Sequence, residues 1–112
     1  LHDALPIFEM VQAMLADMAI KTEAARVLVN NCMRQMDAGE MVRKDGAIVK
    51  TFVTDAMQEV VSNAVQVLGG YGYSEEYPVE KLMRDAKIFQ IFEGSNQIQR
   101  MTIAKELDRE YR

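Results

Sequence analysis

The sequence contains few of the residues on which several common kinds of site depend. Its 112 residues include one cysteine, one histidine and no tryptophan. A single cysteine cannot form a disulfide within the chain, and no cysteine pair or histidine cluster has the spacing of a zinc or haem site. We therefore expect no metal site, and the lack of cysteine pairs favours a reducing compartment.

Excess positive charge and long apolar runs are also lacking. The formal net charge is −4, so the chain offers no basic field for nucleic acid or for an anionic membrane surface. No apolar run approaches the roughly 18 residues that a membrane-spanning helix needs. We therefore expect neither nucleic-acid binding nor a membrane span.

The first seven residues, LHDALPI, need a separate interpretation. They can be encoded by part of a common sequencing-adapter oligonucleotide, so we expect residues 1–7 to be a translated adapter and the domain to occupy residues 8–112. The alternative is a genuine N-terminal tail. If the adapter interpretation holds, the chain is a fragment of a longer product.

Apolar periodicity predicts two long helices. In residues 8–37 the spacing alternates between four and three, which is typical of a helix packed nearly parallel to its neighbours. The positions concerned are Val11, Leu15, Met18, Thr22, Ala25, Val29, Cys32 and Met36. A second helix is expected over residues 47–68, with Asp45 as its N-cap and Gly69-Gly70 as its C-terminal exit.

Two shorter helices follow. One is expected to begin at Pro78 and cover residues 78–87, while the apolar run at 88–92 is too short to classify. The last helix should cover residues 95–110, with Ser95 or Asn96 as N-cap. Its inward positions are predicted to be Ile98, Met101, Ala104 and Leu107. The fold class is thus all-α, an antiparallel helical bundle.

Glu93 is the main candidate for chemistry, because it follows the apolar run IFQIF and directly precedes a glycine. One interpretation is an acid favoured near the positive end of the last helix. The other is a general base in an apolar pocket, where desolvation raises the carboxyl pKa toward the working pH. Gly94 would then let a ligand approach the backbone closely. The SNQ segment after it would offer polar groups and free N–H groups at a helix start.

Taken together, these segments resemble the C-terminal helical domain of the acyl-CoA dehydrogenase family. Residues 64–107, AVQVLGGYGYSEEYPVEKLMRDAKIFQIFEGSNQIQRMTIAKEL, are similar to its closing signature, and MLADMAIKTEAARVLV is similar to the helix before it. The resemblance implies a fragment of a larger three-domain enzyme. The glutamate at position 93 favours the short- and medium-chain-like branch, which also includes branched-short-chain and aryl-acyl types.

The resemblance also implies roles for individual residues. Glu93 would be the base that removes a proton from Cα of an acyl-CoA thioester, while a hydride leaves Cβ for FAD and trans-2-enoyl-CoA forms. Gly94 and Phe92 would contact the substrate, although many members carry tyrosine where Phe92 stands. The positions that would contact FAD fall in two groups: Ser95, Asn96 and Gln97 within the same subunit, and Gln66, Val67, Leu68, Gly69 and Gly70 toward the neighbouring subunit. Ser95 stands where threonine is commoner. Arg84 and Asp85 are expected to be structural and to pair between helices.

The implied full-length protein is a homotetramer that shares FAD at a subunit interface and passes electrons to an electron-transfer flavoprotein. Its setting would be fatty-acid β-oxidation, in the bacterial cytoplasm or the mitochondrial matrix. The isolated chain should bind FAD weakly, if at all, and show no turnover. The alternatives are a stand-alone, non-catalytic helical interaction or assembly module of the same fold, or a related flavoprotein oxidase or enoyl-CoA reductase.

Overall fold

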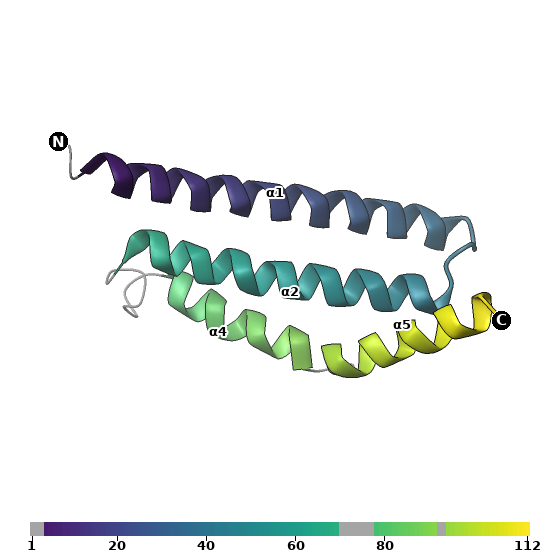
Figure 1. The fold of residues 1–112 in the computed structure, drawn as a ribbon. Helices are drawn as coiled ribbons and strands as arrows, with labels where there is room; N and C mark the ends of the chain where they lie inside the picture. The colour runs from purple at the N-terminus through teal and green to yellow at the C-terminus, as the bar shows by residue number, and fades with distance from the viewer. Residues whose placement is uncertain (1–3, 70–77, 92–93) are drawn as a thin grey trace.

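The computed structural model describes residues 4–69, 78–91 and 94–112, and every regular element within these ranges is a helix. The helices are α1 (Ala4–Asp37), α2 (Arg43–Leu68), α4 (Pro78–Ile91) and α5 (Asn96–Glu110). Helices α1, α4 and α5 run in roughly the same direction, and α2 runs antiparallel to them (Figure 1). The all-α prediction is therefore confirmed.

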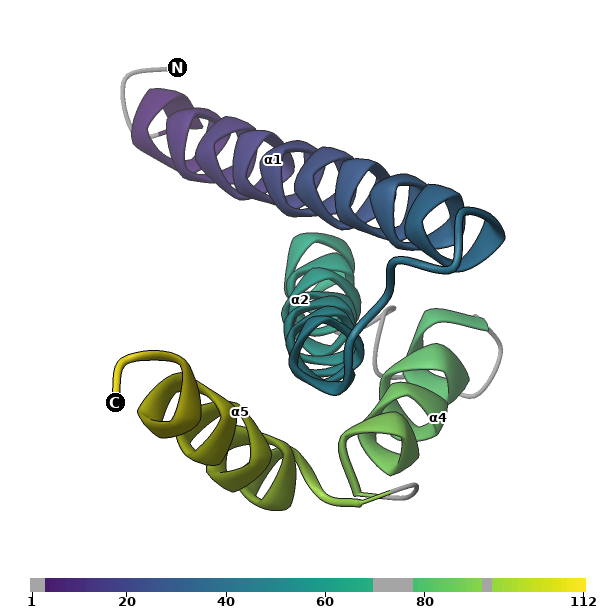
Figure 2. The same cartoon turned by 90° about the vertical axis from the view of Figure 1, so that its right-hand side faces the viewer.

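Helix α2 is central to the arrangement. It packs against α1, α4 and α5, with α1 on one side and the other two on the opposite side (Figure 2). Helices α4 and α5 follow one another along α2, so the junction between them lies beside the middle of α2 (Figure 1). This placement brings the segment around residue 94 next to α2.

The molecule is elongated. Its radius of gyration is 17.5 Å and its extents are 59 × 28 × 27 Å, whereas a compact domain of this length has a radius of gyration of roughly 13 Å. An elongated shape leaves much of each helix unburied. Large apolar side chains are accordingly exposed on α1, α4 and α5, among them Ile20, Val27, Ile88, Ile98 and Met101.

The buried positions carry small or polar side chains. Among the residues that the structure describes, the buried apolar ones are Cys32, Ala47, Ala56 and Ala86, and the buried polar ones are Thr51, Thr54 and Asn96. No large side chain in the described part of the chain is fully buried. Small residues let helix backbones approach closely, but they contribute little apolar area to the core. The hydrogen bonds of the polar residues therefore matter for how the helices are joined.

Helix ends differ from prediction in three places. Helix α1 begins at Ala4, before the expected start at Phe8, and the assignment of residues 1–7 to an adapter remains a prediction. Helix α2 begins at Arg43 with Val42 as its N-cap, so the prediction of Asp45 as N-cap is wrong. Asp45 instead lies in the first turn, where a carboxylate favours the positive end of the helix. Helix α4 continues through residues 88–91, which the sequence left unclassified.

Two predicted helix ends are confirmed. Helix α2 ends at Gly69, whose φ is +64°, and the Gly69 N–H donates to the carbonyl of Gln66 at 3.1 Å. Ser95 is the N-cap of α5, since its Oγ accepts from the N–H of Ile98 at 3.3 Å. Serine is a favoured cap because it satisfies one of the N–H groups that the first turn leaves unpaired.

The predicted inward face of α5 is wrong. Ile98, Met101 and Leu107 are 52%, 58% and 41% exposed, and Ala104 is exposed as well. Asn96 is buried instead, where it hydrogen-bonds to α2, and Ile103 is half-buried. The α1 prediction holds in part, since Cys32 is buried while three of the other predicted seam positions, Leu15, Thr22 and Met36, are exposed.

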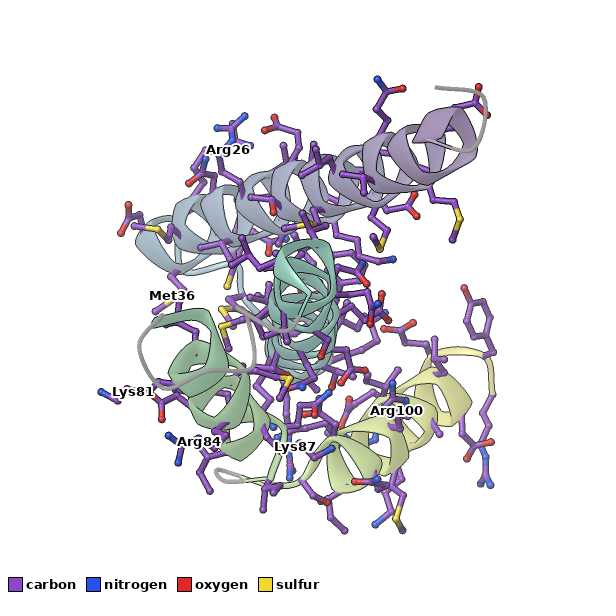
Figure 3. All side chains as sticks on the ribbon, turned by 90° about the vertical axis from the view of Figure 1, so that its left-hand side faces the viewer. Arg26, Met36, Lys81, Arg84, Lys87 and Arg100 are labelled. Atoms are coloured by element: carbon purple, nitrogen blue, oxygen red, sulfur yellow. The ribbon has the colours of Figure 1, made fainter. Side chains whose placement is uncertain are left out.

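Charged side chains lie on the outside of the bundle. Arg26 on α1 and Lys81 and Arg84 on α4 point away from α2 (Figure 3). Asp85 lies 4.0 Å from Lys81, one turn earlier on the same helix. This ion pair of Asp85 is therefore within a helix, not between helices as predicted.

Candidate functional site

The candidate site is the junction between α4 and α5. Phe92 and Glu93, predicted to contact substrate and to act as the base, lie outside the described residues, as does Gly70. The residues on either side are described: Ile91 ends α4, and Gly94 and Ser95 lead into α5. How these flanking residues are held determines how firmly the chain is anchored next to Glu93.

Gly94 adopts a backbone conformation that favours glycine. Its φ is +82°, and an added Cβ would lie 3.0 Å from Nε2 of Gln99. A residue with a side chain would meet both the steric cost of the left-handed region and this close neighbour. Glycine at this position is therefore explained by the turn from α4 into α5, whether or not a ligand approaches it.

Asn96 joins the start of α5 to α2. It is 3% exposed, and its Nδ2 donates to Thr54 Oγ1 at 2.9 Å and to Asp55 Oδ1 at 2.6 Å. Its Oδ1 accepts from the ammonium of Lys50. Both amide hydrogens and the amide oxygen thus have partners on α2, as burial of such a group requires. Contact between Asn96 and a cofactor remains a prediction. Because the Asn96 side chain is engaged with α2, such a contact would be made by the Asn96 backbone.

Asp55 connects three helices. Its Oδ1 accepts from Gln90 of α4 at 2.8 Å and from Asn96, while its Oδ2 accepts from Arg100 of α5 at 2.6 Å. Burial alone would raise the pKa of Asp55, but the hydrogen bonds from Arg100, Asn96 and Gln90 outweigh it and hold the pKa below the ordinary value. The carboxylate is therefore ionised at neutral pH.

Lys50 reaches the junction itself. Its Nζ donates to the carbonyl of Gly94 at 2.9 Å as well as to Asn96 Oδ1. The Thr54 hydroxyl donates to the Lys50 carbonyl at 2.7 Å, one turn along α2. The residue that follows Glu93 in the chain is thus tied to the middle of a 26-residue helix.

Sequence reasoning did not identify Lys50, Thr54 or Asp55 as part of the site. A signal was present, because Lys50, Thr51, Thr54, Asp55 and Gln58 recur at helical spacing and so share one side of α2. Such a polar side on a central helix indicates either a solvated face or a buried network. The sequence does not distinguish these two, because the distinction depends on which helix packs against that face.

The remaining predicted site residues lie at two separate places. Ser95 is half-buried and Gln97 is exposed at the start of α5, whereas Gln66, Leu68 and Gly69 are exposed at the end of α2, with Val67 half-buried between them. Eleven residue steps separate Asp55 from Gln66 along α2, which is about 17 Å. The structure does not bring the two groups together within one chain. The prediction that they serve the FAD of different subunits is untested.

Two other kinds of site find no support among the described residues. No group of three or more histidine, cysteine, aspartate or glutamate side chains there could hold a metal ion. None of the helices in the same ranges is long and apolar enough to cross a membrane.

Comparisons with known proteins identify the family. The sequence profile described as "Acyl-CoA dehydrogenase, C-terminal domain" matches residues 4–107. Cyclohexane-1-carbonyl-CoA dehydrogenase of Geobacter metallireducens is 47% identical over 102 residues, which cover 91% of this chain and 27% of that protein. The chain belongs to the acyl-CoA dehydrogenase family and corresponds to its C-terminal domain.

Solved structures agree with this assignment. Butyryl-CoA dehydrogenase from Megasphaera elsdenii is 46% identical, with a TM-score of 0.85 over 89% of this chain and 26% of that one. An FAD complex of PigA is 25% identical, with a TM-score of 0.85 over 94% of this chain and 27% of that one. The chain therefore spans about a quarter of the length of the relatives it matches. The fold class and the family predicted from the sequence are both confirmed.

Proposed function

We propose that this chain is the base-bearing domain of an FAD-dependent acyl-CoA dehydrogenase. In this proposal Glu93 removes a proton from Cα of an acyl-CoA thioester, and the product is trans-2-enoyl-CoA. Family membership supports the reaction class, since the relatives are named as dehydrogenases of acyl-CoA compounds. The observation that carries the proposal is the attachment of the segment directly after Glu93 to α2 by Lys50 and Asn96.

The chemistry explains why such an attachment is useful. The Cα proton of a thioester is weakly acidic, so the base must be held within reach of it and must be desolvated. Misplacement by about 1 Å can lower the rate of such a step by about 100-fold. The N–H of Glu93 would donate to the thioester oxygen as negative charge develops there. We assign Gly94, directly after the base, as a contact of the acyl chain.

The start of α5 suits the polar edge of a flavin ring. Gln97 is exposed, and Ser95 places a hydroxyl at the helix N-terminus, where unpaired N–H groups gather. We assign these two side chains and the Asn96 backbone to FAD in the same subunit, and residues 66–70 to the FAD of a neighbouring subunit. When bound, FAD accepts the hydride that leaves Cβ.

The proposal extends to the partners of the full-length protein. We assign to it an acyl-CoA substrate, an electron-transfer flavoprotein as electron acceptor and a homotetrameric assembly. Exposed apolar side chains such as Ile20, Val27 and Met101 support burial of these faces by other domains or subunits. The location that follows is the bacterial cytoplasm or the mitochondrial matrix.

Substitution of Glu93 in the full-length enzyme tests the proposal. Glu93→Gln should retain a normal FAD-to-protein ratio but lose the bleaching of the flavin absorbance by acyl-CoA, with the rate falling by at least about 1,000-fold. Glu106→Gln is the matched control, since it makes the same change on α5 where Glu106 pairs with Arg109. Bleaching at the control rate in Glu93→Gln would exclude Glu93 as the base. Rapid oxygen consumption by the reduced enzyme would assign it to the oxidases instead.

A further inference from the structure

Lys50 joins α2 to the junction through two neutral partners. Its ammonium donates to the Gly94 carbonyl at 2.9 Å and to the Asn96 side-chain oxygen. The side chain is half-buried. An ammonium carries three hydrogens, so one lysine side chain can hold both groups.

The charge of Lys50 strengthens both contacts. Hydrogen bonds from a charged donor are stronger than those between neutral groups. One ammonium thus fixes the backbone of Gly94 and the buried Asn96 side chain at the same time.

The backbone from which the Lys50 side chain extends is itself rigid. The residue lies in the interior of α2, and the Thr54 hydroxyl donates to its carbonyl. Thr54 also accepts a hydrogen bond from Asn96 at 2.9 Å. The contact therefore runs from a fixed helix to the carbonyl of the residue covalently bonded to Glu93.

We propose that Lys50 is a positioning residue for the catalytic base: it holds the Gly94–Ser95 peptide unit, one residue beyond Glu93, and so restricts where the carboxylate can stand. This inference rests on the proposed function, because it takes Glu93 to be the base. It predicts that loss of the ammonium slows proton abstraction more than it weakens substrate binding. A lysine that merely holds two helices together would change stability without this selectivity.

The chain offers a matched control in Lys44. This residue also lies on α2 and reaches α5, where its Nζ lies 2.6 Å from Glu110 Oε1. Its partner is at the far end of α5 from the junction. Lys44→Met therefore removes the same kind of helix-to-helix contact and the same charge, while the contacts around Gly94 remain.

The experiment measures the reductive half-reaction of full-length enzymes carrying Lys50→Met, Lys50→Arg, Lys50→Gln or Lys44→Met. We expect Lys50→Met to lower the rate of flavin reduction at saturating acyl-CoA by on the order of 10- to 100-fold. The substrate concentration for half-maximal rate should change less than about threefold. Lys50→Arg, which keeps the charge, should recover part of the rate, and Lys44→Met should match the wild type.

Hydrogen exchange of the peptide covering residues 88–100 supplies a readout independent of turnover. Lys50→Met should speed exchange in this peptide relative to Lys44→Met, with FAD content unchanged. Equal rates of reduction and of exchange in the two methionine variants would overturn the proposal. If Lys50→Met does not yield folded holoenzyme, the same measurements are made on Lys50→Gln. Wild-type rates in that variant would also overturn the proposal. Failure of the Glu93→Gln test would refute the reaction, whereas the exchange result would still show whether Lys50 fixes the junction.

Discussion

The side of α5 that faces α2 begins with hydrogen-bonded polar side chains, whereas the side that faces away exposes large apolar ones. Toward α2 lies Asn96, which is 3% exposed and hydrogen-bonded, and Arg100 reaches Asp55 nearby. Ile103, about one turn beyond Arg100 on the same side, is half-buried. Away from α2 lie Ile98 and Met101, which are 52% and 58% exposed. In an isolated globular domain, large apolar side chains such as these two would usually face inward.

The comparison shows which contacts the chain makes by itself. Directional hydrogen bonds fix α4 and α5 against α2 around the junction. Their strength depends on the distance and angle between donor and acceptor and not on a large buried surface area. The apolar faces, by contrast, contribute little until something covers them. Since the relatives are about four times longer than the matched region, we interpret these faces as surfaces that their other domains or subunits bury.

Breaking the polar side should have the largest effect on stability. Asn96→Leu removes one hydrogen-bond partner each from Thr54, Asp55 and Lys50 and replaces a buried amide that joins α5 to α2. We expect the free energy of unfolding to fall by about 2–4 kcal/mol. Urea titrations followed by circular dichroism measure this loss as a lower urea concentration at the midpoint of unfolding. Gln97→Leu, the same kind of change at the exposed next residue, should stay within about 0.5 kcal/mol. Equal midpoints for the two variants would show that the network contributes nothing measurable.

Acid should weaken the same network to a smaller extent. Because the folded pKa of Asp55 lies below the ordinary value, its stabilisation is present above the unfolded pKa near about 3.9 and is lost as the pH falls through the folded pKa. At pH 7 we expect Asp55→Asn to lower the free energy of unfolding by about 1–2 kcal/mol. Urea midpoints measured between pH 7 and pH 2.5 should show this gap closing below about pH 4.

Asp108→Asn serves as the control for the acid series. Asp108 pairs with Arg112 near the exposed end of the chain, where an ion pair contributes at most about 1 kcal/mol. Its midpoint should follow that of the wild type across the whole pH range. A constant gap between wild type and Asp55→Asn down to pH 2.5 would contradict the role given to this carboxylate.

The apolar side should tolerate charge with the smallest effect. Ile20 is 65% exposed on α1, so Ile20→Lys should change the free energy of unfolding of the isolated chain by less than about 0.5 kcal/mol. It should also reduce binding of a hydrophobic dye such as ANS. Cys32→Lys on the same helix, at a buried position, should cost more than about 2 kcal/mol. A large loss of stability in Ile20→Lys would mean that this face is covered within the chain itself.

Much of the fold was predictable from local chemistry. Apolar periodicity and helix-favouring composition gave the helical segments, and Ser95 and Gly69 were identifiable as a cap and an exit because their side-chain chemistry acts locally. The prediction of Asp45 as the N-cap of α2 was wrong because an acidic residue suits both the N-cap and the first turn of a helix. These two positions differ by a few residues, which is the usual uncertainty of a helix boundary.

The packing of α5 was not predictable in the same way. Periodicity selects the apolar side as the inward side, and in this chain Ile98 and Met101 face outward. The burial of Asn96 depends on Thr54, Asp55 and Lys50, which lie 41 to 46 residues earlier in the sequence. Glu93 and Gly94 stood out by sequence, but the residues that hold their segment are only identifiable once α2 and α5 are placed side by side.

The central place of α2 also has a consequence for the order in which the chain is made. Asp55 leaves the ribosome 41 residues before Asn96, a delay of about 2–8 s at 5–20 residues per second. Until then the groups on α2 that bind Asn96 are hydrated. The unfinished domain therefore exposes polar groups to water at the place where the start of α5 will dock.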